Sequence, residues 1–103
     1  MNQCTSSSPV NITLGVLGGK WKPEILWHLH HKTLRFSELK KLVKGITQKM
    51  LTQELRQLED NKVVIRKIYA EVPPKVEYSL SDYGKTLEPI LKAMASWGEK
   101  HKA

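Results

Sequence analysis

The chain has 103 residues, and 17 Lys and Arg residues against 10 Asp and Glu residues give it a formal net charge of +7. That length fits a single domain, and the basic charge favours a polyanionic partner, because each phosphate that the protein neutralises releases a bound counterion. The sequence lacks an apolar run that could span a bilayer, and its single cysteine excludes an intrachain disulfide, so we expect a cytoplasmic protein without a membrane partner.

The N-terminal part of the chain predicts an arm and a short helix. Residues 1–8 are polar and rich in serine, which is typical of a flexible arm, and residues 9–103 would then form the single domain. Pro9 can open a helix that Gly18 and Gly19 end. The apolar side chains that recur at helical spacing along this segment are Val10, Leu14 and Leu17.

Two further helices follow. The first covers residues 20–31 and tolerates Pro23 in its first turn. After a short strand or turn over residues 32–35, the second covers residues 36–43 and ends before Gly45. The side chains that we expect these two helices to bury are Trp21, Ile25, Leu26, Leu29, Phe36, Leu39 and Leu42.

The helix predicted over residues 47–60 has two different faces. Its leucines recur at helical spacing and need a core, whereas another side carries basic, amide and hydroxyl groups. Thr47 is a suitable N-cap, because its hydroxyl can accept a hydrogen bond from a backbone N–H one turn later. Two helices joined by a short turn that contains Gly45 form a helix-turn-helix.

A β-hairpin is predicted after this helix. Asn61 can adopt the left-handed conformation that ends a helix. Residues 63–70 are β-branched and aromatic, and residues 75–80 alternate between apolar and polar side chains, so both segments predict strands. Pro73 and Pro74 place a loop between them. The predicted fold is therefore a winged helix, mainly α with a small β-hairpin (α+β).

The last helix is predicted from a cap at Ser81 to about Lys102. Its apolar side chains follow a heptad-like spacing of four and three residues. Pro89 interrupts the pattern, so it either bends the helix or moves its start. The apolar residues of this stripe include Leu87, Leu91, Met94 and Trp97.

Motifs along nearly the whole chain carry a resemblance to a known family. They are Gly18–Trp21, Leu34–Leu39, Gly45–Thr52, Leu55–Glu59, Val72–Leu80 and Trp97–Gly98. In this order and spacing they are similar to those of the HxlR-type (MarR-like winged-helix) bacterial transcription regulators. The resemblance implies a sequence-specific DNA-binding regulator, not an enzyme, that binds a pseudo-palindromic operator as a homodimer.

The resemblance also implies roles for both ends of the chain. The terminal helices would form the dimer interface. The family includes members that sense oxidants or electrophiles through an N-terminal cysteine, which makes Cys4 a candidate redox sensor, with a passive thiol as the alternative. The four residues between Cys4 and Pro9 depart from the family's usual pattern, in which proline follows that cysteine more closely. The candidate interface residues are Val10, Leu14, Leu17, Leu87, Leu91, Met94 and Trp97.

The expected DNA contacts come from the helix over residues 47–60 and from a wing over residues 70–76. The helix would enter the major groove, where amide and guanidinium groups pair with base edges, and the wing would meet the flanking backbone or the minor groove. Gln53 and Arg56 are the first choices for reading bases. The full set of base-contact candidates is Gln48, Lys49, Thr52, Gln53 and Arg56. The candidates for phosphate or wing contacts are Lys20, Lys22, Arg35, Lys40, Lys41, Thr47, Lys67, Pro73, Pro74 and Lys75.

Other classes of function have weaker support in the residues. A winged helix can instead serve as a protein-interaction module of a larger assembly, without sequence-specific DNA binding. The segment Gly15–Lys20 lacks the spacing of a phosphate-binding loop, and His28 and His31 have no paired Cys, Asp or Glu at metal-ligand spacing. We therefore expect no cofactor, no metal site and no catalytic activity.

Overall fold

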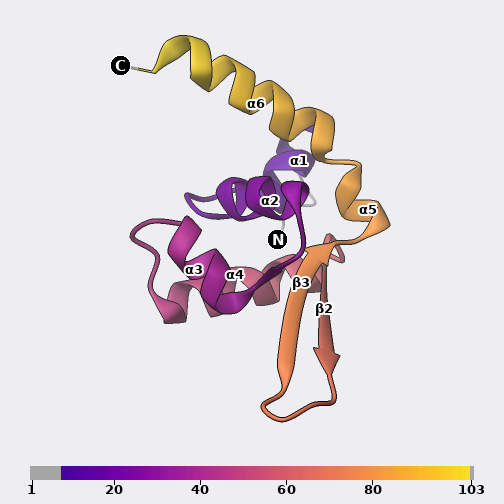
Figure 1. Ribbon diagram of the computed structural model, residues 1–103. Coiled ribbons are helices and arrows are strands. Elements are labelled where there is room, and N and C mark those ends of the chain that lie inside the picture. Colours follow the sequence, from indigo (N-terminus) through magenta and orange to yellow (C-terminus); the bar gives the residue numbers. More distant parts are fainter. Residues whose placement is uncertain (1–7, 103) are drawn as a thin grey trace.

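The computed structural model describes residues 8–102. In chain order its elements are α1 (Pro9–Leu17), α2 (Lys22–His31), β1 (Leu34–Arg35), α3 (Phe36–Leu42), α4 (Gln48–Asp60), β2 (Val64–Tyr69), β3 (Lys75–Leu80), α5 (Asp82–Lys85) and α6 (Glu88–His101). Helices α2, α3 and α4 form the body, the β2–β3 hairpin projects from one end, and α6 lies on the opposite side (Figure 1). This order confirms the predicted mainly α winged helix-turn-helix. The predicted arm falls, apart from Ser8, outside the described residues, as does Cys4.

Helix α4 begins and packs as its sequence predicts. The Met50 backbone N–H donates to the Thr47 hydroxyl at 3.1 Å, which confirms the N-cap. Gly45, with a φ of 88°, supplies the left-handed residue in the turn after α3. The side chains by which α4 joins the core are Leu51, Leu55 and Leu58, all fully buried.

A single core connects the helices with the base of the hairpin. Each fully buried leucine or isoleucine contributes roughly 1.5 to 3 kcal/mol through removal of apolar surface from water. Trp21 and Phe36 are partly buried and pack against this core. Its members are Leu17, Ile25, Leu26, Leu29, Leu34, Leu39, Val43, Ile46, Leu51, Leu55, Leu58, Val63, Val64, Tyr78, Leu80 and Leu91.

The sheet has three antiparallel strands in the order β1-β3-β2. Its register pairs Val64 with Leu80 and Arg66 with Tyr78, and β1 pairs Leu34 with Tyr78. Because side chains alternate between the two faces of a strand, these residues share the face that packs on the core. The residues between them therefore lie on the opposite face of the sheet.

The prediction that Leu42 is buried was wrong, because its side chain is 43% exposed. Phe36, Leu39 and Leu42 follow each other in steps of three residues, and each step falls short of a full helical turn of about 3.6 residues. The third residue has therefore rotated away from the core. Val43, four residues after Leu39, is buried in its place at the C-cap of α3.

The left-handed residue after α4 is Lys62, with a φ of 65°, and not Asn61 as predicted. Asn61 still continues the helical hydrogen bonding, since its N–H donates to the Gln57 carbonyl at 3.0 Å. The Val63 N–H then donates back to the Leu58 carbonyl at 3.1 Å, which closes a Schellman motif around Lys62.

The single C-terminal helix predicted from Ser81 is in fact two helices, α5 and α6. The Ser81 hydroxyl caps only α5, where it accepts from the Gly84 N–H at 2.8 Å. Pro89 lies in the first turn of α6, where a missing N–H costs nothing. Of the two consequences that the sequence allows for Pro89, the shifted helix start is therefore the one that occurs.

Candidate nucleic-acid interface

The exposed face of α4 carries most of the residues predicted to contact bases. Lys49, Gln53 and Arg56 lie on the side of the helix opposite its buried leucines, and all three are exposed. Gln48 is also exposed at the N-terminal end. Thr52 is half-buried, and its hydroxyl donates to the Gln48 carbonyl at 2.9 Å, which leaves its oxygen free to accept another hydrogen bond.

The chemistry of this face suits the edges of base pairs. An arginine can donate two hydrogen bonds to guanine, and a glutamine can pair in two places with adenine. Asp60 follows Arg56 by four residues and is exposed, so it lies on the same face at the C-terminal end of the helix. Because Asp60 would repel phosphates, the N-terminal two-thirds of α4 are the part suited to a groove.

Further basic residues flank α4. Lys40 and Lys41 are exposed in the last turn of α3, immediately before the turn that leads into α4. Lys20 is exposed as well, with its ammonium 4.7 Å from the centre of the Trp21 ring. These three side chains are free to approach a phosphate backbone.

Lys22 does not fit its predicted role as a phosphate contact. Its side chain is buried, with 9% of the residue's surface exposed, and its ammonium donates to the carboxylate of Glu54 at 2.9 Å and to the side-chain oxygen of Gln57. The charge of Lys22 is therefore satisfied inside the protein, where it joins α2 to α4. Sequence reasoning missed this contact because the partners lie 32 and 35 residues away.

The outer face of the sheet gathers three predicted phosphate contacts around one carboxylate. Glu77 of β3 is paired in register with Arg35 of β1 and Lys67 of β2, and the ammonium of Lys75 lies 3.5 Å from its carboxylate. A hydrogen bond from the Tyr69 hydroxyl, followed by the charges of Lys75 and Arg35, lowers the pKa of Glu77. With one negative charge among three positive ones, this face of the sheet remains basic.

The tip of the hairpin is exposed. Two ammonium groups lie near the ring of Tyr69: that of Lys67 is 5.0 Å and that of Lys75 is 4.9 Å from the ring centre. Pro73 and Pro74 are exposed in the loop beyond it. Such cation–π contacts hold the lysines near the end of the wing without neutralising them.

A polar hollow between α4 and the hairpin contains a residue that sequence reasoning missed. Arg66 of β2 lies with its Nε 3.5 Å from Oε1 of Glu59, and both line the hollow together with Thr52, Arg56 and Tyr78. Burial raises the pKa of the Tyr78 hydroxyl, and the charge of Glu59 adds to the effect. Strand alternation, which places Arg66 on the same face as Val64, was the signal that could have pointed to it.

A separate apolar surface lies between α1 and α6. A groove of about 500 Å³ runs between these helices, and Val10, Leu14 and Met94 line it with exposed side chains. Trp97 is 65% exposed further along α6. Of the predicted interface residues, Leu17 and Leu91 are buried in the core of their own chain and Leu87 is half-buried, whereas Ile90, which was not among them, also lines the groove.

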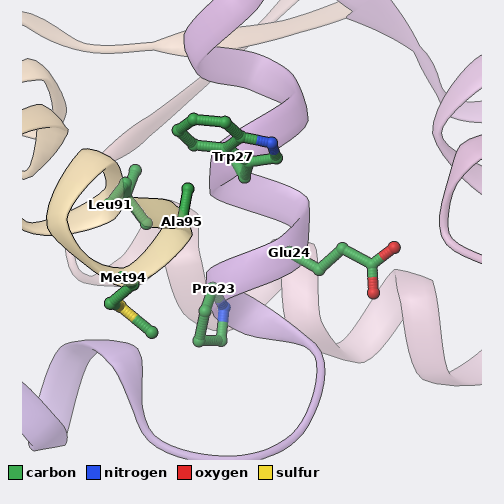
Figure 2. A pocket seen from close by; sticks show the side chains of 6 residues that line it. All are labelled: Pro23, Glu24, Trp27, Leu91, Met94 and Ala95. Atoms are coloured by element: carbon green, nitrogen blue, oxygen red, sulfur yellow. The ribbon is translucent and has the colours of Figure 1, made fainter. Parts of the chain in front are cut away.

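A smaller apolar hollow adjoins this groove where α2 meets α6. Leu91, Met94 and Ala95 of α6 face Pro23 and Trp27 of α2, whereas the carboxylate of Glu24 points away from α6 (Figure 2). The Glu24 carboxylate lies 3.4 Å from His28 instead. The hollow therefore adds to the apolar surface, and none of the described residues that line it turns a charged group toward its interior.

Residues 8–102 hold neither a cluster of metal ligands nor a membrane-spanning helix. No three His, Cys, Asp or Glu side chains of this part of the chain lie close enough together to hold a metal ion. His31, one of the two histidines considered for such a site, has its Nδ1 2.8 Å from the Trp27 carbonyl. Within the same residues no helix has both the length and the apolar character needed to cross a membrane.

Comparison with known families gives a match over most of the chain. The family described as HxlR-like helix-turn-helix matches residues 16–103. The HTH-type transcriptional regulator YdeP of Bacillus subtilis (strain 168) is 53% identical over 94 residues, which are 91% of this chain and 73% of that protein. YtcD, also from B. subtilis (strain 168), is 58% identical over 92 residues, 89% of this chain and 73% of that protein.

Solved structures agree with this assignment. The redox regulator HypR in its oxidised form superposes with a TM-score of 0.90 at 48% identity, covering 93% of this chain and 99% of that chain. The reduced form of the transcriptional regulator YodB from B. subtilis superposes with a TM-score of 0.79 at 31% identity, covering 94% of this chain and 96% of that one. The family and these relatives are transcriptional regulators, not enzymes.

Proposed function

Because this chain belongs to the HxlR-like helix-turn-helix family, it is a DNA-binding transcriptional regulator, and we propose that it acts in the cytoplasm as a homodimer on a pseudo-palindromic operator. Each α4 would lie in a major groove, and each hairpin would touch the flanking backbone or minor groove. One observation carries this proposal: the capped helix α4 turns three leucines into the core and presents Lys49, Gln53 and Arg56 to solvent.

The assignment of roles follows from charge and position. Gln53 and Arg56 lie in the middle of the exposed face, where base edges would be reached, so we assign base reading to them. Thr47, Gln48 and Lys49 lie at the N-terminal end, where the helix dipole favours a phosphate. The backbone on either side would be bound by Lys20, Lys40 and Lys41 on the body, by Arg35 on β1, and by Lys67 and Lys75 on the hairpin.

The apolar surface between α1 and α6 supports the dimer. Val10, Leu14, Met94 and Trp97 are exposed in the single chain, and burying them against a second copy would remove a contiguous apolar patch from water. A second copy related by a twofold axis would also place two α4 helices for the two halves of a palindrome.

Selection of bound fragments from randomised DNA tests the proposed function. We expect enrichment of a site with two inverted halves whose centres lie one helical turn apart, about 10 base pairs, or a multiple of that spacing. Absence of any enriched sequence would contradict sequence-specific binding and would favour a protein-interaction module instead.

The dimer has its own test in analytical ultracentrifugation of the Trp97→Lys variant. This substitution places a charge on the exposed part of α6, so the molecular mass should fall from that of two chains to that of one. Ile68→Lys is the matched control, because Ile68 is equally an exposed apolar residue but lies on the hairpin. A dimer that persists in Trp97→Lys, or a wild-type protein that is monomeric, would contradict the proposed interface.

Response to oxidants through Cys4 is a separate proposal. It is supported by the similarity to HypR, which is called a redox regulator and is solved in oxidised and reduced forms. Two Cys4 thiols of a dimer would form one disulfide, and an oxidant such as diamide would take up their two electrons and two protons. Mass spectrometry after diamide treatment, with operator binding measured in parallel, tests it: unchanged binding by fully oxidised protein would identify Cys4 as a passive thiol.

A further inference from the structure

A second polar hollow lies where the end of α2, strand β3, α5 and the start of α6 meet. Its volume is about 320 Å³. It shares none of its residues with the proposed DNA-binding surface or with the α1–α6 groove. The polar side chains that line it are His30, Lys32, Thr33, Ser79, Lys85 and Glu88.

The charges of this hollow are unbalanced. Glu88 is the only carboxylate among the lining residues, and it lies 2.7 Å from Nδ1 of His30. Lys32 and Lys85 are both exposed, and neither has an ion-pair partner within residues 8–102. Within the described residues, two lysines without an ion-pair partner therefore line the hollow beside one carboxylate, which is already in contact with His30.

We propose that this hollow binds a small organic or inorganic dianion, a phosphate group or a compact dicarboxylate. Two ammonium groups can neutralise two negative charges, and the hydroxyls of Thr33 and Ser79 can donate to the remaining oxygens. The volume lies at the small end of the range for ligand pockets, which suits a metabolite of a few heavy atoms and excludes a large cofactor.

The contact between His30 and Glu88 gives the hollow a connection to α6. His30 is in the last turn of α2 and Glu88 in the first turn of α6, and their side chains are largely buried against each other. A bound dianion would repel Glu88 and compete with it for His30. Binding of the dianion would thus loosen the attachment of α6 to the body. Any effect of this change on DNA affinity rests on the proposed function, but binding of the dianion is independent of that function.

The experiment is an NMR titration of the full chain with inorganic phosphate and, separately, with malonate, at ionic strength held constant with sodium chloride. We expect saturable shifts in the amides of Thr33, Ser79 and Lys85. Lys32→Gln and Lys85→Gln should each weaken binding about tenfold, because each removes a charge-assisted hydrogen bond. Lys92→Gln is the matched control, since Lys92 is an exposed lysine of α6 that does not line the hollow.

Glu88→Gln gives a prediction of opposite sign. Removing its carboxylate should tighten binding, because Glu88 carries the one negative charge among the described residues that line the hollow. Shifts that grow linearly without saturation, or that are equal in wild type and Lys85→Gln, would mean an adventitious ion only and would overturn the proposal. Circular dichroism of each variant confirms that it is folded.

The salt dependence of DNA binding distinguishes an anion site at Lys85 from a contact between Lys85 and DNA. If the two lysines serve the hollow, Lys85→Gln should leave the salt dependence of binding to random DNA unchanged. A slope of log affinity against log salt that falls by about one in this variant would place Lys85 on a DNA phosphate and would overturn the proposal. Either result leaves operator selection by α4 untouched.

Discussion

The ammonium of Lys22 lies 2.9 Å from the carboxylate of Glu54, and this ion pair joins the start of α2 to α4. Both side chains are largely shielded from water, and Gln57 accepts a further hydrogen bond from the same ammonium. The buried leucines set the rotation of α4 about its axis, and this pair adds a polar tie between α2 and α4 beside them.

Replacing Lys22 by Met should therefore destabilise the fold. The substitution leaves the Glu54 carboxylate unpaired in a poorly hydrated place, which costs about 3 kcal/mol when a buried pair is broken. Urea unfolding followed by circular dichroism measures the loss. In the double variant Lys22→Met/Glu54→Leu no charge is left alone, so most of the stability should return; no recovery would show that the packing of Lys22 matters more than its charge.

The N-cap of α4 provides a second test of stability. Thr47→Ala removes the acceptor of the Met50 N–H and should lower the free energy of unfolding by about 1 kcal/mol. Thr47→Ser keeps a hydroxyl in the same position and should stay close to wild type. Equal stability of the Ala and Ser variants would contradict a contribution from the cap.

Gly84 should tolerate no side chain. A Cβ at this position would lie 2.1 Å from the Val63 carbonyl oxygen, so Gly84→Ala must push α5 away from the start of β2 and should cost about 3 kcal/mol. Gly98→Ala is the control within α6, where a Cβ meets nothing within 4 Å. Alanine favours a helix over glycine, so the control should unfold at the same or a higher urea concentration.

Glu77 should make the free energy of unfolding depend on pH in the acidic range. Its pKa is lowered in the folded protein, so its contribution is fully present above the ordinary value of 4.5 and disappears as the pH falls through the lower folded value. The stability difference between wild type and Glu77→Gln should thus be present at neutral pH and vanish in acid. NMR titration of the carboxylate checks the cause, since Tyr69→Phe should raise the pKa of Glu77 by removing the hydrogen bond.

DNA binding should separate base contacts from backbone contacts. Arg56→Ala should lose about 1 to 3 kcal/mol on the selected operator and little on random DNA. Lys40→Ala should weaken both about equally and should reduce the salt dependence by about one counterion. Fluorescence anisotropy at several salt concentrations measures these effects, and equal losses on both DNAs for Arg56→Ala would assign that residue to the backbone.

The elements of this fold could be predicted because their signals are local. Thr47 followed by leucines at helical spacing predicts α4. The alternation of apolar and polar side chains over residues 75–80 predicts a strand, and Pro73 and Pro74 predict the loop of the hairpin. Each of these signals depends on residues within a turn or a strand of one another. The Schellman motif at Lys62 shows the limit of such patterns. Asn61 has the higher intrinsic preference for the left-handed conformation, but the hydrogen bond from the Val63 N–H to the Leu58 carbonyl requires that conformation at Lys62.

The candidate site could be predicted only in part. Exposure of Lys49, Gln53 and Arg56 follows from helical periodicity once the leucines are buried. The pairing of Lys22 with Glu54, and of Arg66 with Glu59, depends on how elements far apart in the sequence pack together. For that reason the sequence predicted a phosphate contact for Lys22, although its ammonium is paired inside the protein.

Leu17 and Leu91 are buried within their own chain, although they belong to the two helices that border the apolar groove. The C-terminal end of α1 and the first half of α6 are thus anchored to their own body before any second copy arrives. Two chains of the proposed dimer would meet with α6 already packed, so association would not have to order that helix at the same time. Dissociation at low concentration should accordingly release folded monomers. The concentration of the regulator would then set the fraction of chains that are dimeric and can bind both halves of an operator.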